Sequence, residues 1–175
     1  MFLSSQGKAK SFEELEPGSI FDTIISGTTG PHLIRAVKAF SKNSSGHEHR
    51  LVTLGPFMAY DENVPGVYDP TVLNKRPVLD VTDSWSFSPS LELSDITVQD
   101  SALNDEQFGL VFISDKYPLM ICARMFGWGN WNAREKHDKC YVNLVSGEIL
   151  SHIDQSSSII TRKWSWLARV EFQPV

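Results

Sequence analysis

The sequence has few of the features that mark membrane, secreted or disulfide-bonded proteins. It contains two cysteines, Cys122 and Cys140, in 175 residues, and their spacing forms neither a disulfide framework nor a zinc knuckle. Both lie within apolar runs, so we expect two buried free thiols. No stretch approaches the ~18 consecutive apolar residues of a membrane span. Residues 1–15 lack the apolar core of a secretory signal, so we expect a cytoplasmic protein.

Basic charge is also scarce. The chain has 16 Lys and Arg against 21 Asp and Glu, a formal net charge of −5, whereas binding to nucleic acid depends on basic surface. We therefore do not expect a nucleic-acid partner, although one local basic group stands out (Arg134, Lys136 and Lys139). A hydrophobic content of 41% is ordinary for a globular protein, and the length suits one domain over residues 1–175.

Helix signals are few, and strand signals recur along the whole chain. Ser11 and Glu14 form a capping-box pattern that Pro17 and Gly18 end after one turn. Residues 32–40 (HLIRAVKAF) could be placed on a helix, but turn residues on both sides favour a strand. The predicted fold is mainly β, a sandwich or barrel of antiparallel hairpins. Its expected strands lie within residues 19–25, 32–40, 47–54, 78–88, 91–98, 108–113, 119–126, 140–153 and 159–172.

One hairpin pattern occurs twice. The first copy consists of residues 32–40 (HLIRAVKAF) and 47–55 (HEHRLVTLG). The second copy consists of residues 119–126 (LMICARMF) and 137–147 (HDKCYVNLVSG). The alignment matches Ile34 with Ile121 and Val52 with Val142. It suggests two related halves, residues 11–57 and 108–175, joined by a long loop and strands within residues 58–107. Residues 55–77 contain four prolines and no usable period, so we interpret them as a long loop, a common place for function.

The two histidines of HEHRLVTLG raise the question of a metal site. In a strand, His47 and His49 lie on one face, and their spacing suits two ligands of one metal ion. The pattern resembles the first motif of cupins but lacks the carboxylate that follows there a few residues later. We expect both histidines to face outward. The opposite face should be buried, and it carries Val52, Leu54, Val142 and Leu144.

The segment FGWGNWN (residues 126–132) carries two of the five tryptophans. Its two glycines allow backbone conformations that other residues rarely adopt. Aromatic residues on a loop bury a large area on binding at a low cost in side-chain entropy, which favours a recognition loop. The alternative is a loop folded back to cap the fold with its tryptophans. Trp164 and Trp166 share one strand face, which is typical of a core. No nucleophile elbow, P-loop or dinucleotide fingerprint occurs, and the carboxylate pairs lie in polar turns.

Two segments resemble small phage-encoded β proteins. FEELEPGSIF (residues 12–21) is similar to their opening strand, and YVNLVSGEI (residues 141–149) is similar to their closing hairpin. The resemblance covers about 20 residues and implies a small β-barrel core and a phage or prophage gene. It carries over no functional residue.

These patterns favour a non-catalytic β domain that binds a protein partner, such as a phage-encoded inhibitor or accessory protein, without a cofactor. Two alternatives remain open, namely a carbohydrate-binding β-sandwich and a metal-dependent enzyme that uses His47 and His49. The predicted partner-binding residues are Trp128, Asn130, Trp131, Arg134 and Lys136.

Overall fold

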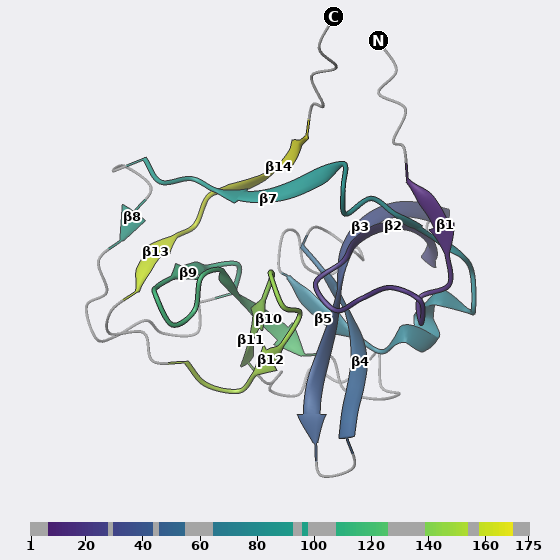
Figure 1. The fold of residues 1–175 in the computed structure, drawn as a ribbon, viewed down its shortest axis with the longest axis horizontal. Helices are drawn as coiled ribbons and strands as arrows, with labels where there is room; N and C mark the ends of the chain where they lie inside the picture. The colour runs from purple at the N-terminus through teal and green to yellow at the C-terminus, as the bar shows by residue number, and fades with distance from the viewer. Residues whose placement is uncertain are drawn as a thin grey trace, which may run out of the picture.

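The computed structural model describes residues 7–27, 30–43, 46–54, 65–92, 96–97, 108–125, 139–153 and 158–169. In this part the chain is mainly β, as predicted, with one short 3-10 helix, η1 (Pro70–Leu73) (Figure 1). The strands are β1 (Lys8–Lys10), β2 (Ile20–Gly27), β3 (Gly30–Asn43), β4 (Gly46–Thr53), β5 (Gly66–Tyr68), β6 (Val78–Asp80), β7 (Trp85–Pro89), β8 (Ile96–Thr97), β9 (Val111–Ile113), β10 (Met120–Met125), β11 (Lys139–Asn143), β12 (Ile149–Leu150), β13 (Ile159–Thr161) and β14 (Trp164–Ala168).

Twelve of the strands form one large sheet, in the order β1-β6-β2-β3-β4-β5-β10-β9-β13-β8, and β11 pairs with β10 and β12. Its pairs are antiparallel except for β5 and β10, which run parallel. One isolated bridge, between Phe40 and Glu148, brings the start of β12 back to β3. The sheet therefore curls towards itself, but the described strands do not close into a barrel, and the architecture is sandwich-like.

The second layer is a two-stranded ribbon of β7 and β14, which crosses one side of the large sheet (Figure 1). An arginine joins the two layers. The Arg35 guanidinium lies 3.7 Å from the centre of the Trp85 ring, and Asp22 accepts hydrogen bonds from it at 2.7 and 2.8 Å. A stacked and doubly hydrogen-bonded guanidinium fixes the ribbon in both distance and direction.

The central core lies between the large sheet and the ribbon. The four positions predicted to be buried on equivalent strand faces are all in it, which confirms the prediction: Val52 (0% exposed), Leu54 (1%), Val142 (0%) and Leu144 (7%). The ribbon packs aromatic side chains against this core, namely Trp85, Phe87, Trp164 and Trp166. The expectation that Trp164 and Trp166 belong to a core is therefore confirmed.

Two further clusters bury the other face of the sheet. The N-terminal cluster covers β2 to β5 and contains Phe12, Leu15, Phe21, Ile34, Ala36, Leu51, Tyr68, Leu73 and Val78. The C-terminal cluster covers β9 to β11 and contains Leu110, Phe112, Met120, Cys122, Tyr141 and Ile160. Strand β11, most of β10 and residues 51–53 of β4 are thus buried on both faces, which explains why β10 and β11 read as apolar runs rather than strict alternations.

Three segments differ from their predicted form. The strand expected over residues 78–88 is divided by a turn at 82–84, because the chain leaves the large sheet after β6 and enters the ribbon as β7. The closing strand expected over residues 159–172 is likewise divided into β13 and β14, which belong to different sheets. The loop expected over residues 55–77 contains β5, which lies between β4 and β10, and η1.

The two similar hairpins form as predicted, but in different registers. In the second hairpin Ile121 pairs with Val142. The aligned residues of the first hairpin are Ile34 and Val52, yet Val52 pairs with Val37, three positions further along β3 (37 against 34). The alignment therefore reproduces the buried faces of β4 and β11 but neither the pairing nor the faces of β3 and β10, since Ile34 belongs to the N-terminal cluster and Ile121 to the central core. The connections also differ, residues 44–45 in one hairpin and 126–138 in the other.

Candidate functional site

The segment that carries Trp128 and Trp131 is attached to a well-defined stem. Arg124 of β10 pairs with Lys139 of β11 on one side and with Gly66 of β5 on the other. Thr53 of β4 pairs with Gly66 in turn, so the four residues form one row across four strands. Strand β10 ends at Met125, just beyond this row, and β11 begins at Lys139 within it, so the residues that bound the 126–138 segment on both sides are held by strand pairing.

The stem is also fixed by side chains. The Arg124 guanidinium lies 4.8 Å from the centre of the Phe108 ring, and the Arg124 amide donates to the Pro65 carbonyl at 2.9 Å. The adjoining β10 residues Met120, Ile121, Cys122 and Ala123 are fully buried. A rigid, buried hairpin is the kind of scaffold on which binding loops are usually carried.

The register also shows which other element extends in the same direction. Met125 pairs with Val67, and Val67 pairs with Val52. Strand β10, read from Arg124 to Met125, therefore runs in the same direction as β4 read backwards from Thr53 to Val52. This direction leads to the exposed end of the β3–β4 hairpin. We call this the hairpin end and define it as residues 40–43 and 46–50; it projects from the body of the fold (Figure 1). The last residue of β10, Met125, and the first residue of β11, Lys139, therefore lie at the ends of these strands that face towards the hairpin end.

All five predicted partner-binding residues lie in that segment, outside the described residues: Trp128, Asn130, Trp131, Arg134 and Lys136. Their predicted role stays a prediction. Lys139, the third member of the local basic group, is half-buried at the stem. The other three tryptophans (Trp85, Trp164 and Trp166) pack against the central core. They are therefore ribbon-to-sheet contacts rather than an open platform for stacking a sugar.

His47 and His49 are exposed at the hairpin end, as expected. The His47 ring packs on Phe40, with ring centroids 4.9 Å apart. Partial burial lowers the pKa of His49, and the nearby Lys38 and His47 lower it further, which favours the neutral imidazole. Neutral imidazole is the form that binds metal ions. Among the described residues, no group of three or more His, Cys, Asp or Glu side chains is placed to hold a metal ion.

The cysteines are free and buried, which confirms the prediction. Burial raises the pKa of the Cys122 thiol to about 12, although nearby Lys139 lowers it. A thiol that stays protonated at neutral pH is a poor nucleophile. Cys140 lies on the adjacent strand and belongs to the central core, whereas Cys122 belongs to the C-terminal cluster. The two thiols therefore lie on opposite faces of the sheet.

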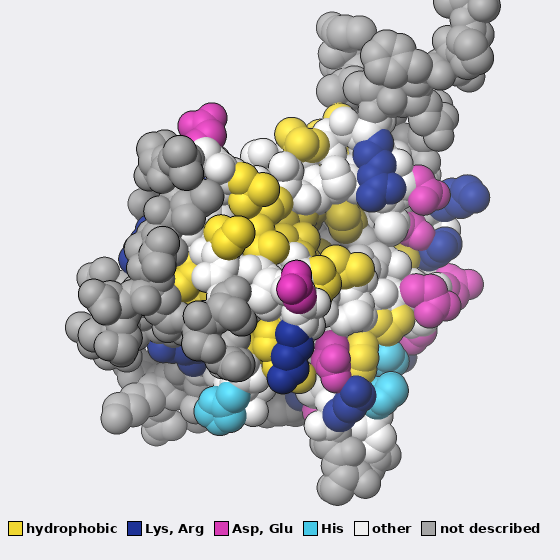
Figure 2. Space-filling model, turned by 60° about the vertical axis from the view of Figure 1, so that its left-hand side comes forward, with side chains coloured by type: hydrophobic (Ala, Val, Ile, Leu, Met, Phe, Trp, Pro, Cys, Tyr) yellow, Lys and Arg dark blue, Asp and Glu magenta, His cyan; other side chains and the backbone are white. Residues whose placement is uncertain are grey.

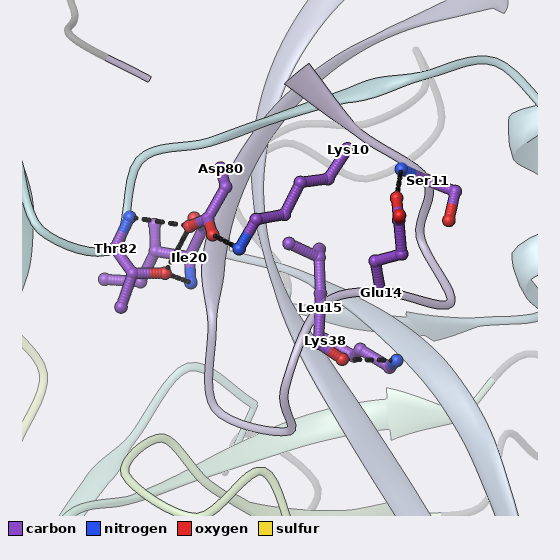
Figure 3. Close-up of polar contacts among 8 residues, drawn as sticks. All are labelled: Lys10, Ser11, Glu14, Leu15, Ile20, Lys38, Asp80 and Thr82. Carbon is purple, nitrogen blue, oxygen red and sulfur yellow. Dashed lines mark hydrogen bonds and ion pairs between the residues drawn. The ribbon is translucent and has the colours of Figure 1, made fainter. Parts of the chain in front are cut away.

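Residues 7–19, which we call the N-terminal strap, cover the N-terminal cluster and are held by a buried lysine. Lys38 is 2% exposed, and its ammonium group donates to the carbonyl oxygens of Glu13 (3.0 Å) and Leu15 (2.6 Å). It also lies 5.1 Å from the centre of the Phe12 ring. These bonds satisfy carbonyl groups at the end of the single turn that the sequence predicted. The Glu14 carboxylate accepts from the Ser11 amide at 2.6 Å, as a capping box requires (Figure 3).

A second polar network anchors the strap to β2 and β6. The Lys10 ammonium donates to Asp80 at 2.7 Å, and Asp80 also accepts from the amide and hydroxyl of Thr82 (Figure 3). The Thr82 hydroxyl accepts from the Ile20 amide at 3.0 Å. Burial alone would raise the pKa of Asp80. The hydrogen bonds from Lys10 and Thr82 outweigh this effect and lower the pKa.

This network predicts acid sensitivity. Since the pKa of Asp80 is lower in the folded than in the unfolded chain, its stabilising effect is complete above the unfolded value of about 4. It is lost as the pH falls through the lower, folded value. We expect Asp80→Asn to be less stable than the wild type at pH 7 and to lose less stability below pH 4. Urea unfolding at pH 7 and pH 3 measures both effects, with exposed Asp115→Asn as the control. If Asp80→Asn loses as much stability between pH 7 and pH 3 as the wild type does, Asp80 is not the source of the acid sensitivity.

The strap also meets the turn between β11 and β12, so residues 12–21 and 141–149 contact each other. The Gly18 amide donates to the Lys38 carbonyl at 2.8 Å, and the Phe40 amide donates to the Gly147 carbonyl at 2.8 Å. A Cβ atom added at Gly147 would lie 2.6 Å from the Gly18 nitrogen. Gly18 and Gly147 both have positive φ angles, 85° and 75°. We call this contact the glycine junction.

Hydrophobic side chains also reach the surface. The face that comes forward in Figure 2 shows a gathering of them with charged groups around it. Exposed large hydrophobic residues near the ribbon and its neighbouring strand are Leu91 (58%), Leu167 (50%) and Ile159 (46%). Surfaces of this kind are typical of contact with other proteins. In the part of the chain that the structure describes, no helix has the length and hydropathy that a membrane span needs.

Sequence reasoning did not find the parts that support the candidate site. Residues 66–68 form a strand that pairs with both hairpins, but a segment of three residues is too short to predict a strand from its sequence. The stacking of Arg124 on Phe108 depends on the tertiary fold. The glycine at position 66, between Pro65 and an apolar pair, was the only local sign of a strand start. Comparisons with protein-family models, with curated proteins and with solved structures found no match to this chain.

Proposed function

We propose that this protein is a non-catalytic binding module that recognises a protein partner through the 126–138 segment together with the hairpin end. An inhibitor or accessory protein of phage origin that works in the cytoplasm is the concrete form of this proposal. One observation carries it: the ends of β10 and β11 to which the tryptophan-bearing segment is attached face in the same direction along the sheet as the exposed hairpin end. Two elements that lie far apart in the sequence can then contribute to one contact surface.

The chemistry of these elements favours a protein. Trp128 and Trp131 supply large, stiff anchors, which are enriched among the residues that dominate binding energies. Arg134 and Lys136 add positive potential that would steer an acidic partner.

The test compares two variants with the wild type. The tagged full-length chain captures partners from a lysate of the native host, and calorimetry measures the affinity for each purified partner. We expect Trp128→Ala combined with Trp131→Ala to weaken binding by at least ~2 kcal/mol, roughly thirty-fold. Melting temperature should fall much less than for a core tryptophan, whose truncation typically costs ~3–5 kcal/mol.

The control is Leu33→Ala. Leu33 is 73% exposed and lies near the start of β3, far along that strand from the hairpin end, so its loss should leave affinity unchanged. If melting collapses in the double tryptophan variant while the affinity of the folded fraction is unchanged, the tryptophans are structural caps and the proposal is wrong. Specific hits on a glycan array, lost in the same variant, would favour the carbohydrate-binding alternative instead.

A further inference from the structure

The hairpin end presents two imidazoles on one side of a strand that is locked in register. Lys42 pairs with His47, and Phe40 pairs with His49. Residues two apart in a strand point to the same face, with Cα atoms separated by about 6.6–6.8 Å. Contact with the Phe40 ring, 4.9 Å between centroids, restricts the orientation of His47. Both side chains are exposed, so an ion can reach them from solvent.

The charged groups around the pair are already engaged. Glu48 lies on the opposite face of β4 and pairs with Arg50 at 2.7 Å, and Arg50 also contacts Asp69 at 3.0 Å. Lys42, on the same face as the histidines, is paired with Glu148 at 2.6 Å. The Lys42 charge is therefore compensated. Neither Glu48 nor Glu148 is needed to complete the arrangement.

We propose that His47 and His49 form a two-point binding site for a borderline divalent transition-metal ion, with water in the remaining coordination positions. Imidazole nitrogen suits Zn²⁺, Ni²⁺ and Cu²⁺, and two rings on alternate strand positions can converge on one ion at about 2.0–2.1 Å. Two ligands leave open positions on the ion, so the site is a surface chelate rather than a closed structural zinc site. This inference does not depend on the proposed partner binding.

The experiment uses the full chain, stripped with a chelator, and titrates it with Ni²⁺ or Zn²⁺ alone in calorimetry at pH 7.5. We expect one saturable site in the wild type. His49→Ala and, separately, His47→Ala should each weaken it by at least about ten-fold, because either change removes one arm of the chelate. The matched control is His152→Ala, another exposed histidine in the described part of the chain, which should leave the affinity unchanged.

A second readout is thermal. Because an ion that binds only the folded chain raises its melting temperature, added Ni²⁺ should stabilise the wild type and His152→Ala but neither hairpin-end variant. The melting temperature without metal shows that each variant is folded. The proposal is overturned if the wild type shows no saturable binding up to millimolar metal. It is equally overturned if both hairpin-end variants bind within about two-fold of the wild type.

Discussion

Val142→Asp is expected to lose about 4 kcal/mol or more of unfolding free energy. Val142 is fully buried in the central core and pairs with Ile121 on one side and Ile149 on the other. An aspartate there has no partner within an apolar cluster, so burying its carboxyl group costs several kcal/mol in addition to the lost apolar contacts. Domains of this size are stable by only about 5–15 kcal/mol, so a large part of the chain should unfold. Urea or thermal unfolding measures the loss.

The matched control is Val145→Asp. Val145 is the same residue type three positions along the chain (145 against 142), but it is 62% exposed in the turn before β12. Its replacement should change stability by less than about 0.5 kcal/mol. Equal losses for the two variants would show that the assigned faces of β11 are wrong.

Gly147→Ala is expected to cost about 3 kcal/mol or more. The φ angle of 75° is unfavourable for alanine. The added methyl group would also lie 2.6 Å from the Gly18 nitrogen and 2.7 Å from the Lys38 carbonyl oxygen. Both neighbours are backbone atoms in hydrogen-bonded segments, so neither can move without breaking the glycine junction. Denaturant unfolding is the direct measurement.

Gly46→Ala separates the two contributions. Gly46 also has a positive φ, 130°, but a Cβ atom there would meet nothing within 4 Å. It reports backbone strain alone, and a φ of 130° is at least as unfavourable for alanine as 75°. Any loss of stability in Gly147→Ala beyond that in Gly46→Ala is therefore a lower bound on the cost of the close contact. A loss of less than about 1 kcal/mol in Gly147→Ala would show that the junction is not tightly packed.

Local patterns were enough to predict most strands and the buried faces. Alternation around Val52 and Val142 identified the central core because a strand's period of two is a strictly local property. The same reasoning failed where a neighbour decides the outcome. Nothing in the residues between Val78 and Ser88 shows that the chain changes sheets there, because the reason is the stacking of Arg35, far away in sequence, on Trp85.

The candidate site was predictable only in part. The exposure of the two histidines could be predicted from the alternation of faces along the strand. The tryptophan-bearing segment could be identified as a candidate from its tryptophan and glycine content. The common direction of the hairpin end and of the strand ends that bound residues 126–138 did not follow from the sequence, since it depends on β5 pairing with β4 and β10 at once. Lys38 was also missed as a buried residue. A lysine in an alternating segment is ordinarily solvent-exposed, and only the strap carbonyls that accept its hydrogen bonds explain its burial.

The glycine junction also has a consequence for how quickly the native state can form. It joins residues 18, 38 and 147, and the parallel pairing of β5 with β10 joins residues 66 and 124. Such contacts form only after long stretches of chain have been brought together, at a cost in loop-closure entropy. The β2–β3–β4 meander, by contrast, needs only short connections. A topology dominated by distant pairings folds in milliseconds to seconds rather than microseconds. We therefore expect the face of the meander that belongs to the central core to stay uncovered until the second hairpin pairs with it.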